Sequence, residues 1–380
     1  MATVTKTIGT SSRDYSDINS WEADLSDDSI YADTNDAVGV MYADATFTNA
    51  TVTIDGGISI GTSSGQDLAS ITLTVVAADR HDGTAASGAL LKPTANSGHN
   101  QGIIRVNRDN VTIEWLDIDM DNDDDLTTAD TRNTNKGIVL VEDNNNNIIR
   151  NNIIRDKYGD PGGTGPQGIS HIGTGASSDS LYIFNNIIYN LIETSNDSAA
   201  GVLVHSWAGN LYIYNNTVYN IQGAGGSKHG IGFRFGNTAS CNTRIKNNIA
   251  SKCEGGNDRA YWQSASGSTV DSANNLSDDT THATYDAEDM GQSLNDSSAL
   301  IGKTLAEIGF VSTTVGSEDL HIGTALSVCN MAGVDLGTTN GVDIDINGRD
   351  RDALGDAWTI GAHQFTAIAE NGSAFLLFLD

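Results

Sequence analysis

The sequence has few prolines, few cysteines and few aromatic residues. Three prolines stand beside 41 glycines in 380 residues, and aromatic residues make up 6%. Three cysteines (Cys241, Cys253 and Cys329) cannot form the even disulfide framework that holds small secreted domains together. Because Asn, Asp, Thr and Ser are abundant beside the glycines, the composition favours a turn-rich, all-β protein.

Basic residues are also scarce. The chain has 20 Lys and Arg against 49 Asp and Glu, which gives a formal net charge of −29. Non-specific binding to nucleic acid depends on neutralising phosphates with Lys and Arg, and an anionic membrane surface attracts the same side chains. The charge therefore argues against both partners. The acidic surface either serves solubility in salty surroundings, docks on a basic partner or binds cations.

Long hydrophobic runs are missing as well. No segment is long enough to span a bilayer, and the start of the chain shows no charged region followed by an apolar one, so we expect no secretory signal. The tail from Ala374 to Leu379 is apolar but short. It packs either on the protein's own end or in a neighbouring subunit.

A motif built around an Asn pair returns four times. The pairs begin at Asn151, Asn185, Asn215 and Asn247, which lie 34, 30 and 32 residues apart. A fixed period in this range is typical of a repeat architecture, in which each unit buries its apolar face on the next. Apolar residues alternate with other residues before each pair, so each unit contains short strands without room for a helix.

The alternation predicts one buried column. Successive residues of a strand point to opposite faces, so the isoleucines two positions before each pair should stack inside the solenoid. Asn tolerates the left-handed backbone region, so the pair can turn the chain while its amide bonds to the next turn. The column is Ile149, Ile183, Ile213 and Ile245; the glycines that open the units are Gly137, Gly168, Gly201 and Gly230; Trp115-Leu116 replaces the pair in an earlier copy.

Both ends resemble caps. Tyr15, Ile18, Trp21 and Leu25 have helical spacing, and Ser16 is the expected N-cap of an amphipathic helix that covers the open end of the column. We therefore divide the chain into an N-terminal cap at 1–30, coils at 31–315 and a closing segment with the apolar tail at 316–380.

The whole pattern resembles the pectin-lyase-like family of right-handed parallel β-helix proteins. The segment Asp14–Trp21 is similar to the capping helix of that family, and Asp345–Arg349 with the following Ile360-Gly-Ala is similar to its closing strands. The opening residues 2–16 resemble the start of β-helix proteins encoded by tailed bacteriophages. The resemblance implies one single-stranded right-handed parallel β-helix.

The resemblance leaves three functions open. The first is a non-enzymatic virion component (a capsid decoration, fibre or tail-associated protein) that is made in the host cytoplasm and contacts other virion proteins or copies of itself, as in a trimer. The second is a polysaccharide lyase or hydrolase, either a phage depolymerase or an exported extracellular enzyme. The third is an adhesin that binds cell-surface polysaccharide.

Four basic residues are catalytic candidates for the enzyme hypothesis. His205 and Arg234 are expected at the same outward position of adjacent turns, about 5 Å apart, and Lys228 and His229 precede the second turn. A base beside a guanidinium suits proton abstraction next to a carboxylate. Alternatively, these side chains form a polar ladder that covers the sheet. His171 is expected to point inward.

A group of aromatic residues is expected on the outer face of neighbouring turns. Such side chains bind sugar rings, form a subunit interface or pack beneath loops that fold back over the sheet. The candidates are Phe184, Tyr182, Tyr189, Tyr212, Tyr214 and Tyr219.

Two acidic segments are candidates for calcium, which takes six to eight oxygen ligands. The first contains Asp119, Asp121, Asp123 and Asp125, and the second is Asp343–Gly348. Neither completes an EF-hand pattern, and a solvated acidic loop is the alternative for both. Within the second, Asp345 and Arg349 are expected to form an ion pair that fixes the turn.

Overall fold

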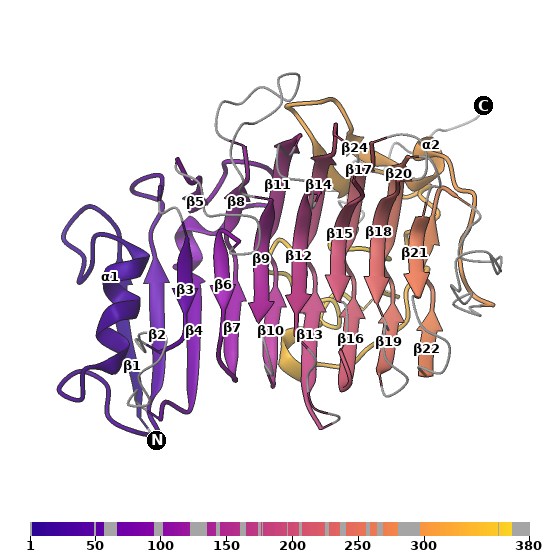
Figure 1. Cartoon of the computed structure of the whole chain (residues 1–380). Coiled ribbons are helices and arrows are strands. Elements are labelled where there is room, and N and C mark those ends of the chain that lie inside the picture. Colours follow the sequence, from indigo (N-terminus) through magenta and orange to yellow (C-terminus); the bar gives the residue numbers. More distant parts are fainter. Residues whose placement is uncertain are drawn as a thin grey trace, which may run out of the picture.

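The computed structural model of the chain describes residues 2–48, 51–56, 67–94, 102–121, 135–141, 145–159, 165–173, 176, 178–195, 197–204, 207–224, 228–235, 241–255, 259–263, 269–279, 297–355 and 357–366. The chain coils as a right-handed parallel β-helix, as predicted, and its strands belong to three parallel sheets that run the length of the solenoid (Figure 1). The central turns each contribute one strand to each sheet, so strands that are neighbours in a sheet lie about one repeat apart in the sequence.

Sheet A has nine strands, in the order β1 (Thr3–Ile8), β2 (Asp36–Met41), β4 (Ser70–Val75), β7 (Val111–Glu114), β10 (Asn147–Arg150), β13 (Ser180–Phe184), β16 (Asn210–Tyr214), β19 (Asn242–Lys246) and β22 (Thr269–Ala273). Sheet B has seven: β5 (Leu90–Leu91), β8 (Asp117–Asp119), β11 (Ile153–Tyr158), β14 (Ile187–Ile192), β17 (Thr217–Gln222), β20 (Ile249–Glu254) and β23 (Leu276–Ser277). Sheet C also has seven: β3 (Val52–Ile54), β6 (Ile104–Val106), β9 (Lys136–Val141), β12 (Gln167–Ile172), β15 (Ala199–Val204), β18 (Gly230–Phe235) and β21 (Arg259–Gln263).

The isoleucine column lies in the core. Ile149, Ile183, Ile213 and Ile245 are paired in register along sheet A, and all four are fully buried. The file continues to Ile113 in one direction, whereas a serine, Ser272, takes the position in β22. Period-two alternation over each short strand is therefore sufficient to place this part of the core.

The two residues of each Asn pair have different structural roles. The first adopts a left-handed backbone conformation, with φ between 53° and 57°, and turns the chain from sheet A into sheet B. The second points inward and forms a ladder: the Asn152 amide donates to Asn186 Oδ1 at 3.1 Å, and the same bond recurs on every later turn. The ladder continues through Asn186–Asn216, Asn216–Asn248 and Asn248–Asn275, each at 3.0 Å.

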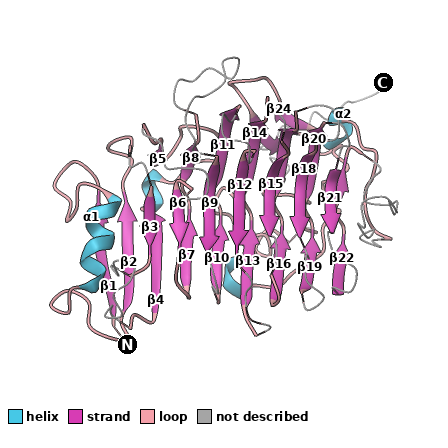
Figure 2. Cartoon of the chain, in the orientation of Figure 1, coloured by secondary structure: helices cyan, strands magenta, loops and turns pink. Residues whose placement is uncertain are grey.

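A short helix, α1 (Ile18–Ala23), lies at the N-terminal end of the solenoid (Figures 1 and 2). Ile18, Trp21 and Leu25 are fully buried in the same cluster as the column, as the spacing predicts. The N-cap is Asp17 rather than Ser16, because the Asp17 carboxylate accepts a hydrogen bond from the Ser20 N–H at 2.9 Å. Both residue types cap helices, so the sequence alone did not decide between neighbours.

The C-terminal segment 297–366 lies along the flank of the solenoid, and we call it the strap. It contains α2 (Leu305–Ile308) and the antiparallel pair β24 (Phe310–Ser312) and β25 (Asp319–Ile322). In Figure 1 the orange and yellow strap passes behind the strands of the later turns. It covers the corner at which the Asn pairs turn the chain. The side-chain amides of the first Asn residues donate to strap carbonyls as follows: Asn274 to Ala332, Asn247 to Val334, Asn215 to Val342, Asn185 to Val342 and Ile344, and Asn151 to Ile344 and Asp345.

Replacement of Asn216 by Ala tests the inner ladder. The Asn216 amide donates to the Ile183 carbonyl and Asn248 Oδ1, and its oxygen accepts from Asn186. Each buried group left without a partner costs about 1–3 kcal/mol. We expect a loss of about 3–5 kcal/mol in the free energy of unfolding, measured by chemical denaturation. The control is Asn242→Ala, an exposed strand residue, which should change stability by less than about 0.5 kcal/mol. Equal effects of the two substitutions would contradict a structural role for the ladder.

Candidate functional site on the outer face of sheet B

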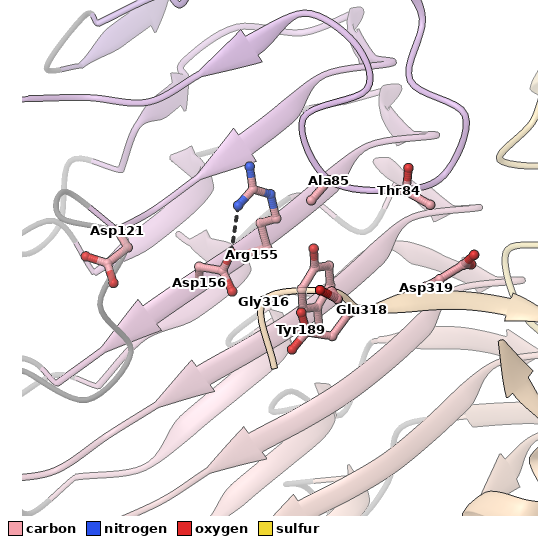
Figure 3. A pocket seen from close by; sticks show the side chains of 10 residues that line it. Thr84, Ala85, Asp121, Arg155, Asp156, Tyr189, Gly316, Glu318 and Asp319 are labelled. Atoms are coloured by element: carbon pink, nitrogen blue, oxygen red, sulfur yellow. Dashed lines mark hydrogen bonds and ion pairs between the residues drawn. The ribbon is translucent and has the colours of Figure 1, made fainter. Parts of the chain in front are cut away.

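A cleft of about 470 Å³ lies where the strap meets the outer face of sheet B. Arg155 and Asp156 come from β11 and Tyr189 from β14, while Glu318 and Asp319 come from the strap (Figure 3). The remaining lining residues are Thr84, Ala85, Asp121, Gly316 and Ser317. Most of the ionisable groups in the lining are carboxylates, so the cleft concentrates negative charge around one guanidinium.

Arg155 holds the floor of the cleft together. Its guanidinium lies 2.9 Å from Asp117, 3.2 Å from Asp119 and 2.6 Å from Asp156. Lys92 adds a second cation, 3.2 Å from Asp119. Burial alone would lower the pKa of Arg155, but Asp117 and Asp119 raise it above its ordinary value. Arg155 is therefore a permanent cation committed to ion pairs rather than a base.

Asp156 and Glu318 face each other across one amide. The Asn190 side chain donates to Asp156 Oδ1 at 2.9 Å and to Glu318 Oε1 at 2.8 Å. Burial raises the pKa of Asp156, against the opposing effect of Arg155, and burial also raises the pKa of the adjacent Tyr189 hydroxyl. A carboxyl group whose pKa is raised beside a second carboxylate is an arrangement suited to general acid–base chemistry.

Sequence reasoning did not find Arg155, Asp156 or Glu318. Arg155 is paired in register with Tyr189, which is paired with Tyr219. The next two turns therefore have Tyr followed by Asn at the positions where this turn has Arg155 followed by Asp156. This departure from the repeat was the one signal in the solenoid sequence that could have indicated Arg155 and Asp156. Nothing in the repeat indicated Glu318, because it belongs to the strap.

Half of the aromatic candidates are covered. Phe184, Tyr189 and Tyr219 are 1–3% exposed beneath strap residues, so for these three the alternative in which a segment folds back over the sheet applies. Tyr182 and Tyr212 stack face to face with ring centroids 4.5 Å apart. These two line a hollow of about 340 Å³, together with Phe184, Tyr214, Arg244, Leu336, Thr339 and Val342.

The expected pairing of His205 with Arg234 is wrong. Arg234 is paired with Leu203, because Gly230 lies opposite Ala199 and the register aligns Gly201 with Gly232. The sequence Gly230-Ile-Gly232 offered two glycines, and stacking selects the second. His205 itself lies outside the described residues.

Two of the other basic candidates, Arg234 and His229, contact the ring of Trp262. The Arg234 guanidinium lies 4.1 Å from the ring centroid of Trp262, and the His229 ring meets the same indole edge-on at 5.2 Å. Burial, with a contribution from Arg259, lowers the pKa of Arg234. Lys228 is half-buried directly before His229. His171 points into the core, where its ring packs edge-on against Trp207 at 4.8 Å.

The first acidic segment is only partly described. Asp119 forms ion pairs with Lys92 and Arg155, and its pKa is raised by burial against their effect. Asp121 is fully buried at the edge of the cleft, and its N–H donates to Asp119. Asp123 and Asp125 lie outside the described residues, so their role as calcium ligands stays a prediction.

A second, more open hollow of about 650 Å³ shares Asp319 with the cleft. His321 Nδ1 lies 2.5 Å from Asp319 Oδ1, and its Nε2 lies 2.8 Å from Asn347 Oδ1. The His363 ring meets His321 edge-on at 4.5 Å and accepts the Ile322 N–H on Nδ1. Burial, with the nearby cations, lowers the pKa of His363 to about 2, so this ring stays neutral.

No protein-family model, curated protein or solved structure matches this chain. In the described part of the chain, no helix has both the length and the apolar character needed to cross a membrane.

His363 should make the fold sensitive to acid. The unfolded histidine binds a proton below about pH 6.5, whereas the folded one resists protonation down to about pH 2. The contribution of His363 to the free energy of unfolding is therefore fully present above pH 6.5. It is lost as the pH decreases, by up to about 1.4 kcal/mol per pH unit.

His363→Asn tests this assignment, because its amide oxygen can replace Nδ1 as the acceptor for the Ile322 N–H. We expect the variant to show a flatter dependence of unfolding free energy on pH between 6 and 4, measured by denaturant titration at each pH. Parallel curves for the two proteins would contradict the buried neutral histidine.

Proposed function

We propose that this chain is a non-enzymatic structural component of a tailed-phage virion, as a fibre, tail-associated protein or capsid decoration. One observation supports the proposal above the others: the strap is hydrogen-bonded to each of the turns that begin their bend at Asn151, Asn185, Asn215, Asn247 and Asn274. A segment fastened to successive turns prevents them from separating, which suits a rod that must keep one shape outside the cell.

The anchor of the strap is a buried arginine. Arg351 is 0% exposed, and its guanidinium donates to strap carbonyls at Thr359, Gly361 and Ala362 and to Asn185 Oδ1 on the solenoid. Burial lowers its pKa to about 10. Loss of this guanidinium would leave buried carbonyls without a donor, at about 1–3 kcal/mol for each, and would remove one bond between the strap and the solenoid.

This proposal places the protein in the virion, made in the host cytoplasm, with other virion proteins or further copies of itself as partners. A trimer is the oligomer that the phage resemblance suggests. The exposed large apolar side chains of the strap support a protein partner: of the seven in the described residues, six lie between 305 and 334, including Val311, Val315, Leu326 and Met331.

Incorporation into particles tests the proposal. We expect quantitative mass spectrometry of density-purified particles from the encoding phage to find this chain at a copy number comparable with other structural proteins. Arg351→Met, which loosens the strap, should reduce incorporation at least tenfold, whereas Asn242→Ala should not. Recovery of the wild-type chain only in the soluble lysate, with none in washed particles, would overturn the proposal.

The cleft favours polysaccharide hydrolysis as a second candidate. Asp156 has a raised pKa and shares Asn190 with Glu318, and both line a hollow at the outer face of a sheet. A glycoside hydrolase uses one protonated and one ionised carboxyl group around the scissile bond.

Release of reducing ends from a panel of acidic and neutral polysaccharides tests this second function. We expect Asp156→Asn and Glu318→Gln each to lower the rate at least 100-fold, because each removes one of the two carboxyl groups. The control is Asp271→Asn, an exposed partner of Lys246 on sheet A, which should keep the full rate. A wild-type rate at background on every substrate, or unchanged rates in both cleft variants, would exclude the cleft as a hydrolase site.

A further inference from the structure

The hollow lined by Tyr182 and Tyr212 lies between the outer face of sheet A and the strap, and we call it the aromatic hollow. Its volume of about 340 Å³ is near the lower end of the range of about 300–1,000 Å³ that is usual for small-molecule sites. Among the described residues that line it, Arg244 is the one charged group and none is acidic. In a chain of net charge −29, a hollow with one cation and no carboxylate favours an anionic ligand.

Arg244 is held in position by an aromatic stack. Tyr182, Tyr212 and Arg244 are paired in register on three successive turns. The two tyrosine rings are nearly parallel, at 7°, with centroids 4.5 Å apart, and the Arg244 guanidinium lies 5.0 Å from the Tyr212 centroid. Stacking uses the face of a guanidinium and leaves the N–H donors at its edge available. Within the described residues, these donors make no hydrogen bond and no ion pair.

The acid opposite Arg244 on the next turn is already engaged. Asp271 is paired with Arg244 in register, but its carboxylate binds Lys246 at 2.7 Å. Arg155 in the cleft, by contrast, contacts three carboxylates of the protein. Arg244 is only partly buried, so its donors can be reached from solvent. The guanidinium is therefore available to a carboxylate from outside the chain.

The rest of the hollow is apolar or aromatic. Phe184 and Val342 are 1% and 3% exposed, and they belong to one cluster with Tyr182, Tyr214 and Leu336. Burial raises the pKa of Tyr214, against the opposing effect of the nearby guanidinium, so its hydroxyl keeps its proton and remains a hydrogen-bond donor. A ligand that fits this lining offers an apolar ring surface as well as a negative charge.

The strap wall of the hollow is fixed to the solenoid. The Val342 carbonyl accepts the side-chain amides of Asn185 at 3.1 Å and Asn215 at 3.2 Å. The expected ion pair between Asp345 and Arg349 is present at 2.7 Å and fixes the turn that follows. The hollow is therefore formed before any ligand arrives, which reduces the entropy lost on binding.

We propose that the aromatic hollow binds a small ring-bearing carboxylate, with the carboxylate on the Arg244 guanidinium and the ring between the tyrosine side chains and Leu336. One guanidinium balances one negative charge, which favours a carboxylate over a phosphate group that carries about −1.5 to −2. An acidic sugar and a free aromatic acid share this chemistry, because each combines one ring with one carboxylate. The site shares no residue with the cleft, so it is a further function beyond both candidates above.

Calorimetric titration of the whole chain with matched ligand pairs tests the site. The pairs are glucuronate with glucose, and benzoate with benzyl alcohol. We expect at least one carboxylate to bind saturably, and at least tenfold more tightly than its neutral partner, because only the carboxylate pairs with Arg244. Tighter binding of glucuronate would identify an acidic sugar as the source of the ligand, and tighter binding of benzoate an aromatic acid. No saturable binding of either carboxylate at millimolar concentration would overturn the proposal.

Two variants locate the binding. Arg244→Gln removes the cation and should lower the affinity for the carboxylate at least tenfold, to that of the neutral partner. Thr339→Trp, at an exposed strap residue of the lining, should fill the hollow and abolish binding while Arg244 is intact.

The control for both variants is Lys6→Gln, which removes one positive charge from a distant strand of sheet A and should bind as the wild type does. Chemical denaturation should show similar stability for Arg244→Gln and the wild type, because the guanidinium makes no hydrogen bond within the described residues. Wild-type affinity in both Arg244→Gln and Thr339→Trp would place the ligand elsewhere and contradict the site. None of these measurements depends on incorporation into particles.

Discussion

The buried asparagine ladder is the interaction on which the rest of the structure depends. At the corner between sheets A and B the backbone turns inside the protein, where its N–H and C=O groups cannot reach water. The side chain of Asn186 supplies partners for these groups: it accepts a hydrogen bond from the Asn152 N–H and donates to the Ile149 carbonyl and to Asn216 Oδ1. Each turn therefore supplies hydrogen bonds that its neighbours need, and the spacing of successive turns is fixed by amide geometry as well as by strand pairing.

The other member of each pair connects this ladder to the strap. A left-handed residue at a corner directs its side chain out of the solenoid, and Asn185 uses that direction to bind the carbonyls of Val342 and Ile344. One dipeptide therefore serves the inside and the outside of the same corner. The cleft follows from this arrangement, because the strap, once placed beside sheet B, brings Glu318 to the Asn190 amide that also binds Asp156.

The sequence predicts those features that depend on local periodicity. The buried file of Ile149, Ile183 and Ile213 follows from alternation, and the turns follow from the position of the Asn pairs. Register at Gly230 and Gly232 could not be chosen from one turn, because both glycines fit and only stacking on Gly201 distinguishes them. The path of the strap was also not predictable, since its partners along the flank are main-chain carbonyls that every residue carries. Phe184 and Tyr189 were therefore expected at the surface but are covered.

The direction of the strap has a consequence for how the protein assembles. Its contacts join residues that are far apart along the chain, such as Asn151 with Asp345 and Asn185 with Ile344, which are 194 and 159 positions apart. During synthesis the early turns must therefore stack with their outer amides facing water, and they are fastened only after the strap itself has left the ribosome. Loop-closure entropy makes such distant contacts slow to form, so the final latching step sets when the solenoid becomes resistant to fraying.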